Sequence, residues 1–309
     1  MAWRYAALAA GVLVVSTAAL LIRLAIDAGA GPLAIAAGRL TLAALVVAPL
    51  AAILRGPELA RLRRPDWGIA AVAGVFLALH FATWIASLRY TSVASSVALV
   101  TTNPIWVGLL SWWLLAEPPS RRTVAGIGLA VLGSGLVIAS DLVAGPAAPG
   151  RAPTLGNALA LAGAMAISGY FLVGRGLNRR LTLLAYVAIV YGAGALAINA
   201  IAIAAGQGLW TIPAIAWLPI ALMALGPQLV GHTLINASLR HLSATFVALA
   251  ILGEPVGAAL LAWLLLGETF APLQLAGFLA LLAGIAVAAR GERAAGAPAA
   301  AAARPSGPS

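Results

Sequence analysis

The sequence predicts an all-α integral membrane protein with ten transmembrane helices in two inverted five-helix repeats. Of its 309 residues, 63% are hydrophobic and only 8% are charged, whereas soluble domains carry about 25% charged residues. So few charges cannot cover the surface of a water-soluble protein of this length, which argues against a soluble enzyme, a disordered chain and a coiled coil. Ten helices of about 20–23 residues each fit within the chain and leave room for short loops.

Ten apolar segments are long enough to cross a bilayer. They cover residues 5–27, 32–54, 67–88, 92–115, 123–143, 155–174, 182–205, 215–238, 243–266 and 271–289. Short breaks with Gly, Pro or charged residues separate them. The first segment is too long for the apolar core of a signal peptide, so we interpret it as a spanning helix.

The composition between and after the spans suggests the domain boundaries. Residues 1–144 form the first predicted repeat and residues 155–290 the second, and the Gly- and Pro-rich segment 145–154 links them. Residues 291–309 contain little besides Ala, Pro, Gly and Ser, which predicts a disordered tail.

Arginine supplies every basic residue, and its distribution predicts the orientation. With a cytoplasmic N-terminus, the outer segments hold only Arg89 and Arg151, Arg23 and Arg39 fall inside spans, and all other arginines lie in inner segments. Cytoplasmic loops of membrane proteins carry this excess of positive charge. We therefore expect a multi-pass protein of the bacterial inner membrane with both termini in the cytoplasm, its basic residues serving the membrane rather than nucleic acid.

The two halves of the chain repeat each other. Pairs separated by 151 positions are Pro104 and Pro255, Trp112 and Trp263, Glu117 and Glu268, Gly126 and Gly277, and Gly133 and Gly284. Pairs separated by 152 positions are Ser16 and Ser168, Arg23 and Arg175, and His80 and His232. Because each half has an odd number of spans, the second half must enter the membrane upside down. Inverted repeats of this kind are typical of alternating-access transporters, with a substrate site near the midplane.

Several of these motifs give the chain a family resemblance. The motifs are Ala37–Ala44, Asn103–Glu117 and Gly126–Gly135, with Glu254–Glu268 and Gly277–Gly284 in the second half. On these residues the chain, from about 5 to 290, resembles the EamA family of the drug/metabolite transporter (DMT) superfamily. The resemblance implies an inner-membrane carrier, in most cases an exporter of amino acids, other small metabolites or drugs. It also implies that spans one to four and six to nine surround a cavity, with spans five and ten peripheral.

Glu254 is the strongest candidate for a residue of the substrate site. It lies midway along the ninth span, where an ionised carboxylate is costly and functional by default. Its repeat counterpart is the neutral Asn103, so the fold does not require an acid there. Pro255 and Pro104 each follow directly and cannot donate a backbone hydrogen bond, so we expect helix breaks at both. Glu254 can hold a substrate amine, a cation or a coupling proton; the alternative is a protonated carboxyl satisfied by nearby backbone.

Two spans carry side-chain stripes at spacing i, i+4, i+8, which places each stripe on one helix face. The stripe of the eighth span is Gln228, His232 and Asn236, and that of the third span is Phe76, His80 and Trp84. We expect Gln228, His232, Asn236, His80 and Trp84 to line the cavity. Either histidine could carry a proton because of its pKa range, although a lone histidine on an apolar face is more often a satisfied core residue.

Arg39 and Trp106 are the remaining candidates for substrate binding. Arg39 lies well inside the second span, where a guanidinium could hold a substrate carboxylate, but a structural role tying helix ends is the favoured interpretation. Trp106 lies near mid-membrane and could stack on a flat or cationic ligand. Arg23 and Arg175 lie near span ends, where their side chains can snorkel.

The sequence contains no signature of an enzyme. It has no phosphate-binding loop with a Lys, no His-Glu-x-x-His motif and no Gly-x-Ser-x-Gly elbow around a serine. It also has no Cys, so thiol nucleophiles and thiolate metal sites are excluded. We expect no cofactor and no metal, only coupling to protons through Glu254.

These observations favour a secondary transporter, an exporter of small metabolites such as amino acids that works by alternating access. Two alternatives stay open: a broad exporter of cationic lipophilic drugs, and a membrane scaffold that transports nothing. The expected partners are a small-molecule substrate and the lipid bilayer. The glycines of the fifth span, such as Gly126 and Gly133, could serve either internal packing or a homodimer.

Overall fold

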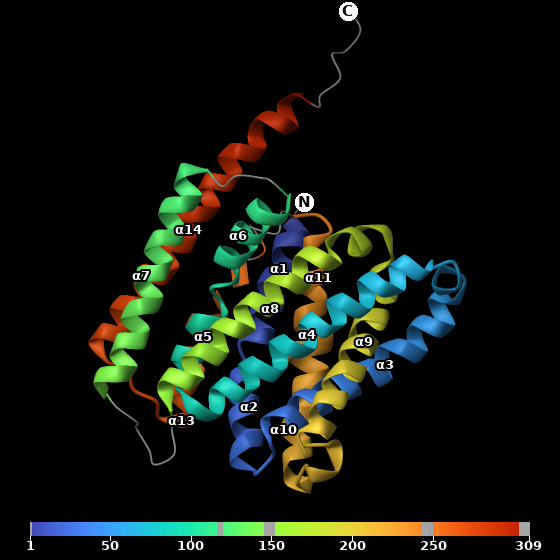
Figure 1. Ribbon diagram of the computed structural model, residues 1–309, viewed down its shortest axis with the longest axis horizontal. Helices are drawn as coiled ribbons and strands as arrows, with labels where there is room; N and C mark the ends of the chain where they lie inside the picture. Colours follow the sequence, from blue (N-terminus) through green and yellow to red (C-terminus); the bar gives the residue numbers. More distant parts are fainter. Residues whose placement is uncertain are drawn as a thin grey trace, which may run out of the picture.

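A computed structural model of the chain describes residues 2–115, 120–144, 152–242, 247, 250–251 and 253–302. Within these ranges the structure is all-helical, with no strand. Figure 1 shows a tilted bundle with two helices set apart on one side, and the start of the first helix and the end of the last both lie toward the top of the view.

The helices follow the predicted spans closely. They are α1 (Ala2–Val15), α2 (Ala18–Asp27), α3 (Pro32–Ala60), α4 (Arg64–Tyr90), α5 (Val93–Val100), α6 (Asn103–Leu115), α7 (Arg121–Ala144), α8 (Pro153–Arg180), α9 (Leu183–Ala204), the short η1 (Leu209–Thr211) and η2 (Ala214–Ala216), α10 (Trp217–Met223), η3 (Ala224–His232), α11 (Thr233–Leu239), α13 (Gly253–Leu266) and α14 (Pro272–Ala302). The last helix extends into 291–309, for which the composition predicts disorder, and residues 303–309 lie outside the described ranges. Most of the predicted linker, 145–151, also lies outside them.

Seven helical stretches among the described residues are long and apolar enough to cross a membrane. They occupy the predicted spans one to four and six to eight. Three shorter apolar stretches, Val124–Ser140, Gly253–Leu266 and Pro272–Gly284, occupy the predicted fifth, ninth and tenth spans. The protein is therefore a multi-pass membrane protein, and the count of ten spans stays a prediction.

Two predicted spans are broken helices. The first span, expected as one helix, divides into α1 and α2 at Ser16–Thr17. The Ser16 hydroxyl donates to the carbonyl of Val12 at 2.9 Å, a local bond that often bends helices. The fourth span divides into α5 and α6 at Thr101–Thr102, directly before Asn103 and Pro104. Both breaks fall near the middle of their spans, where they free backbone for other contacts.

The eighth span is also irregular, although the sequence predicts a single helix over 215–238. It starts with the 3₁₀ turn η2, continues as α10, widens into the π-helix η3 and ends as α11. Pro227 lies inside the π-helical stretch. Because proline cannot donate to the preceding turn and its ring crowds that turn, the regular helix gives way there. Such wide turns often occur at functional sites.

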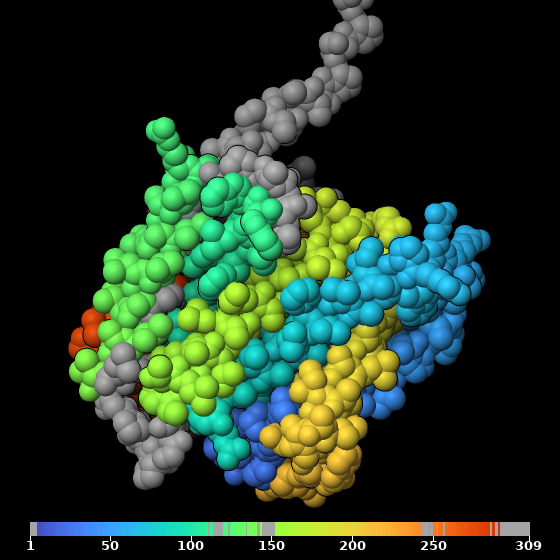
Figure 2. Space-filling view, in the orientation of Figure 1, coloured from blue at the N-terminus to red at the C-terminus, as the bar shows by residue number. Residues whose placement is uncertain are grey.

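Small residues let the central helices approach closely. In Figure 2, α4 in cyan and α8 in yellow-green run side by side across the face of the molecule. A Cβ atom built on Gly74 of α4 would come within 2.7 Å of the backbone nitrogen of Gly194 on α9. Glycine at this position therefore sets how closely α4 and α9 pack.

Helices α7 and α14 pair with each other at the edge of the bundle (Figure 1). A Cβ on Gly133 would lie 2.5 Å from the backbone nitrogen of Leu281, and one on Gly284 would lie 2.5 Å from that of Ala130. The glycines of the fifth and tenth spans thus pack α7 against α14 within one chain. Internal packing is therefore the role of Gly133 and Gly284, whereas a Cβ on Gly128 or Gly135 would meet nothing within 4 Å.

Polar ties join the two halves at the end of the bundle where α3 meets α4 and α8 meets α9, here called the arginine-rich end. The Glu58 carboxylate accepts hydrogen bonds from the backbone N–H and the hydroxyl of Thr182, each at 2.7 Å, and so caps the start of α9. Asp66, at the start of α4, pairs with Arg180 at the end of α8. These contacts fix the position of α3 and α4 against α8 and α9.

Candidate functional site

A small cavity of about 40 Å³ lies between helices from both halves of the bundle. Both halves of the chain contribute to it. Its walls are His80 and Trp84 of α4, Val100, Thr101 and Asn103 at the α5–α6 break, Ile167 and Phe171 of α8, His232 and Ile235 around the end of η3, and Ile251 and Glu254 at the start of α13. Of the residues predicted from the sequence, His80, Trp84, Asn103, His232 and Glu254 therefore share one site.

Glu254 and Asn103 give this cavity its acceptors. Glu254 is 9% exposed, and its side chain makes no hydrogen bond or ion pair with another described residue. Asn103 is also buried, and its Oδ1 has no hydrogen-bond partner within the described part of the chain. We call these two groups the acceptor pole. Buried polar groups are rarely left unpaired, so this pole is suited to a ligand that donates hydrogen bonds.

The α5–α6 break is held by α8. The Ser168 hydroxyl donates to the backbone carbonyl of Asn103 at 3.0 Å and to that of Ala164 in its own helix at 2.7 Å. Its repeat counterpart, Ser16, bonds backward in the same way and lies beside Gly257 of α13, where an added Cβ would meet the Ser16 hydroxyl at 2.6 Å. The repeat thus places a serine against each helix segment that follows an acceptor-pole residue.

His80 has a defined hydrogen-bonding role. Its Nδ1 lies 2.9 Å from the backbone carbonyl oxygen of Gly163 on α8. A carbonyl can only accept, so Nδ1 carries the proton. The ring also stacks on Trp84, with 5.7 Å between centroids. Trp84 Nε1 is buried and has no hydrogen-bond partner among the described residues, so the residues that line the cavity include one unpaired donor.

Arg39 and Gln228 lie one layer behind the cavity. The Arg39 guanidinium is fully buried, its Nε donates to Oε1 of Gln228 at 2.9 Å, and its Cζ lies 4.0 Å from the centroid of the Phe81 ring. The Phe81 ring in turn packs edge-on against His232, at 5.6 Å. Neither Arg39 nor Gln228 is among the residues that line the central cavity, and Phe81 contacts both Arg39 and the cavity residue His232.

Two other predicted residues lie elsewhere. Asn236 accepts a hydrogen bond from the Tyr170 hydroxyl at 2.9 Å and lines a second, smaller pocket with Arg175 and Arg179, toward the arginine-rich end. Trp106 donates its indole N–H to Thr102 at 3.2 Å and is not among the residues that line the central cavity. The two stripes thus contribute their histidines and Trp84 to the cavity but not Gln228 or Asn236.

Sequence reasoning missed two aromatic residues of the site. Phe171 lines both the central cavity and the pocket containing Asn236, so it stands between them. The Arg39 guanidinium lies over the face of the Phe81 ring. Both phenylalanines lie in long helices with many apolar residues, where periodicity does not single out one phenylalanine. The sequence could have indicated these two residues only through their neighbours, since Phe81 directly follows His80 and Phe171 directly follows Tyr170.

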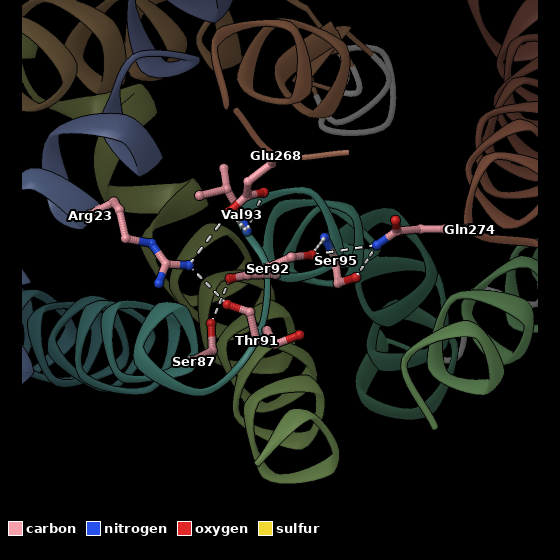
Figure 3. Close-up of polar contacts among 9 residues, drawn as sticks. Arg23, Ser87, Thr91, Ser92, Val93, Ser95, Glu268 and Gln274 are labelled. Carbon is pink, nitrogen blue, oxygen red and sulfur yellow. Dashed lines mark hydrogen bonds and ion pairs between the residues drawn. The ribbon is translucent and has the colours of Figure 1, made fainter. Parts of the chain in front are cut away.

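A polar network closes the end of the bundle opposite the arginine-rich end (Figure 3). Arg23 of α2 donates to the backbone carbonyl of Thr91 at 2.9 Å and lies 3.8 Å from the Glu268 carboxylate. The same carboxylate accepts from the backbone N–H of Val93 at the start of α5. Gln274 of α14 donates to the hydroxyls of Ser92 and Ser95, at 3.4 and 2.6 Å. We call these residues the opposite-end network.

Arg23 therefore does not snorkel, although its position near a span end allows it. Its side chain is buried and is directed at the Thr91 carbonyl and the Glu268 carboxylate (Figure 3). Glu117, the repeat counterpart of Glu268, lies outside the described residues.

Comparison with known proteins now identifies the family. The model of the EamA-like transporter family matches residues 2–139 and 154–290, which are the two predicted repeats almost in full. The chain belongs to the EamA-like transporter family. Members of this family are DMT-type transporters, so the central cavity belongs to a membrane transporter.

The fold also has a solved counterpart. The chain is similar to a protein of known crystal structure, with a TM-score of 0.65 over 95% of this chain and 99% of the other. At 21% sequence identity this likeness shows a shared fold alone. No curated protein matched the sequence.

Proposed function

We propose that this EamA-like transporter exports small metabolites that carry a basic amine, foremost apolar amino acids. The observation that carries the proposal is the acceptor pole: Glu254 and Asn103 Oδ1, both buried and without a hydrogen-bond partner among the described residues, lie in one central cavity. An ammonium group donates three hydrogen bonds and carries the charge that a buried carboxylate requires. The isoleucines and Phe171 of the same cavity favour an apolar side chain.

The proposed architecture is ten spans in two inverted repeats, residues 1–144 and 155–290, in the bacterial inner membrane. The arginine-rich end is then cytoplasmic, because it gathers Arg61, Arg63, Arg64, Arg179 and Arg180. The opposite-end network faces the outside. Inversion places equivalent helices of the two repeats across the cavity from each other, with the substrate site between them.

Alternating access follows from this arrangement. The present cavity of about 40 Å³ is far below the roughly 300–1,000 Å³ typical of ligand sites, so substrate must bind in a conformation with more separated repeats. The break at Thr101–Thr102, directly before Asn103, lets α5 and α6 move separately. In each of the two conformations, the contacts at one end of the bundle, either the arginine-rich end or the opposite-end network, break while those at the other end remain.

The proposed coupling to protons depends on Glu254, whose carboxylate would bind the substrate ammonium and the proton in turn. If Glu254 binds either the substrate ammonium or a proton, the two compete for one site, and entry of a proton releases the amine. A proton gradient directed inward then drives export. The proposal needs no cofactor, since the exchange uses only the Glu254 carboxyl.

The test is flux in proteoliposomes loaded with labelled apolar amino acids, with and without a pH gradient, for wild type and Glu254→Gln. We expect gradient-dependent efflux in the wild type and its loss or uncoupling in the variant. Asn103→Asp is the matched change, because it gives the first repeat the acid that the second has. Flux and pH dependence that are unaffected by Glu254→Gln would remove the residue from its proposed role.

Export of lipophilic cations is the second candidate, and the aromatic walls of the cavity favour it. Trp84 and Phe171 can stack on a flat cation beside Glu254. Cells expressing the protein would then resist dyes and quaternary ammonium compounds. Negligible amino-acid flux together with Glu254-dependent dye efflux would select this function over the first.

A further inference from the structure

A second set of unpaired polar groups lies behind Phe81, and all of them are donors. Nη1 and Nη2 of Arg39 and Nε2 of Gln228 are buried and have no hydrogen-bond partner among the described residues. Both side chains are 0% exposed. We call these three nitrogens the donor pole. They belong to two residues that already bond each other through Arg39 Nε and Gln228 Oε1.

The hydrogen-bonding capacity of Arg39 and Gln228 shows that the three nitrogens lack acceptors. A guanidinium has five N–H groups and no acceptor, so the Gln228 amide must turn its oxygen toward Arg39 and its NH₂ away. In this arrangement none of the three nitrogens has an acceptor among the described residues. The pole therefore requires oxygen atoms from another group.

The charge of Arg39 is also unpaired. The ion pairs within the described part of the chain are Arg23–Glu268 and Arg180–Asp66, and neither includes Arg39. Glu254 is near enough to interact with Arg39 electrostatically, but the two form no ion pair within 4.0 Å. A fully buried guanidinium without a carboxylate partner is strongly destabilising. A structural tie between helices would need only the Nε bond and would not retain this uncompensated charge.

We propose that Arg39 and Gln228 form a carboxylate subsite, so that the transported molecule is a zwitterion. The proposal rests on the proposed transport function and names its substrate class. A carboxylate can accept two parallel hydrogen bonds from the guanidinium and a third from Gln228 Nε2. The substrate then lies with its ammonium at Glu254 and Asn103 and its carboxylate at Arg39 and Gln228.

Phe81 controls the path between the two poles. Its ring contacts both the Arg39 guanidinium and, edge-on, the His232 ring of the cavity wall. Gln228 and His232 are both in the π-helix η3, whereas Phe81 is in α4. A shift of α4 relative to η3, as one repeat moves against the other, withdraws the ring and joins the donor pole to the cavity. In the present conformation the subsite is shut.

The experiment compares ligands that differ only in one charged group. The probes are leucine, its decarboxylated amine 3-methylbutylamine and its deaminated acid 4-methylpentanoate, with phenylalanine, phenylethylamine and 3-phenylpropionate as a second series. Two quantities are measured for each protein: efflux from proteoliposomes, and the rise in melting temperature that each probe gives to purified protein. The variants are Arg39→Gln and Gln228→Glu.

We expect Arg39→Gln to lower the ratio of amino-acid efflux to amine efflux about tenfold or more, because two charge-assisted hydrogen bonds are lost. Gln228→Glu should lower the same ratio and also raise the melting temperature without ligand, because its carboxylate pairs with Arg39 internally. The matched control is Arg23→Gln, another buried arginine but outside the site. It should leave the ratio at the wild-type value, whatever its effect on total flux.

The outcomes separate the subsite from the transport function. Equal loss of amino-acid and amine efflux in Arg39→Gln, or a stabilised Gln228→Glu with wild-type selectivity, would overturn the carboxylate subsite and leave transport in place. If the wild type moves no probe, the transport proposal fails. The melting temperatures then decide on the subsite. If amino acids and carboxylic acids raise the melting temperature of the wild type but not that of Arg39→Gln, the carboxylate subsite is supported. If they raise the melting temperature of both proteins, or of neither, the subsite is contradicted.

Discussion

The guanidinium of Arg23 lies 3.8 Å from the carboxylate of Glu268, joining α2 to the segment between α13 and α14. Glu268 also accepts the N–H of Val93 at the start of α5. One carboxylate thus connects three parts of the bundle that are far apart in sequence. Since it lies at the end away from the arginine-rich end, it is placed to hold that end closed.

The first prediction concerns this contact. Replacing Arg23 with Gln removes the ion pair, so the closed end should open more often. A partly buried pair of this kind contributes on the order of 1 kcal/mol, which shifts a two-state equilibrium roughly fivefold. The chain has no Cys, so Val100→Cys in the cavity wall gives a single reporter. We expect several-fold faster labelling by an impermeant maleimide added from that end.

The control for this experiment is labelling from the arginine-rich end. It should slow or stay constant in Arg23→Gln, because opening one end competes with opening the other. Labelling that accelerates equally from both sides would indicate general loosening and contradict a closing role for the Arg23–Glu268 pair.

The second prediction concerns the packing of α7 on α14. Gly284→Val places side-chain atoms where the backbone of Ala130 already lies within 2.5 Å of a Cβ. Overpacking of this kind costs about 1–3 kcal/mol or more, so the melting temperature in detergent should fall by several degrees. Gly128→Val is the matched change, because a Cβ there meets nothing within 4 Å. An equal fall in both variants would show that helix propensity, not packing, is responsible.

The third prediction concerns the arginine-rich end. Glu58→Ala removes both hydrogen bonds to Thr182 at the start of α9 and should lower the free energy of unfolding by about 1–3 kcal/mol. Arg180→Ala, which breaks the pair with Asp66, should cost less than about 1 kcal/mol, because the Arg180 side chain is 58% exposed. Denaturant unfolding of the two variants measures the ranking, and the reverse order would contradict it.

The fourth prediction concerns His80. Asn in its place keeps a donor for the carbonyl of Gly163, whereas Phe keeps the ring and loses the donor. We expect His80→Phe to unfold more easily than His80→Asn by about 0.5–1.5 kcal/mol, the net value of one hydrogen bond. If His80 instead acts as an obligatory proton carrier, both variants lose pH-dependent flux alike. Flux that persists in His80→Asn assigns the residue to positioning α4 on α8.

The helix interruptions show which breaks the local sequence can predict and which it cannot. Pro104 follows directly after a gap between two helices, in line with the missing N–H of proline. The division of the first span at Ser16–Thr17 has no proline and was not predicted. A serine hydroxyl can bond backward in any helix, and only the packing of α13 against Ser16 makes this one significant.

The eighth span shows where periodicity stops being reliable. Residues 228, 232 and 236 share a face of a regular α-helix, yet Gln228 bonds Arg39, His232 lines the cavity and Asn236 bonds Tyr170. The π-helix around Pro227 changes the direction of the chain between them. In addition, three positions on one face still extend over two helical turns, so they meet different neighbours at different depths.

By itself the sequence determined the membrane class and the family, and it predicted a two-repeat organisation and a central cluster around Glu254. Hydrophobicity, charge distribution and repeated Pro, Gly and His positions are properties of the chain that no neighbour can change. Tertiary structure alone decided which buried polar atoms are left unpaired among the described residues, such as the acceptor Asn103 Oδ1 and the donors of Arg39 and Gln228. Whether a buried group has a partner depends on side chains from distant helices, because hydrogen bonds act over about 3 Å and no spacing along the chain encodes that proximity.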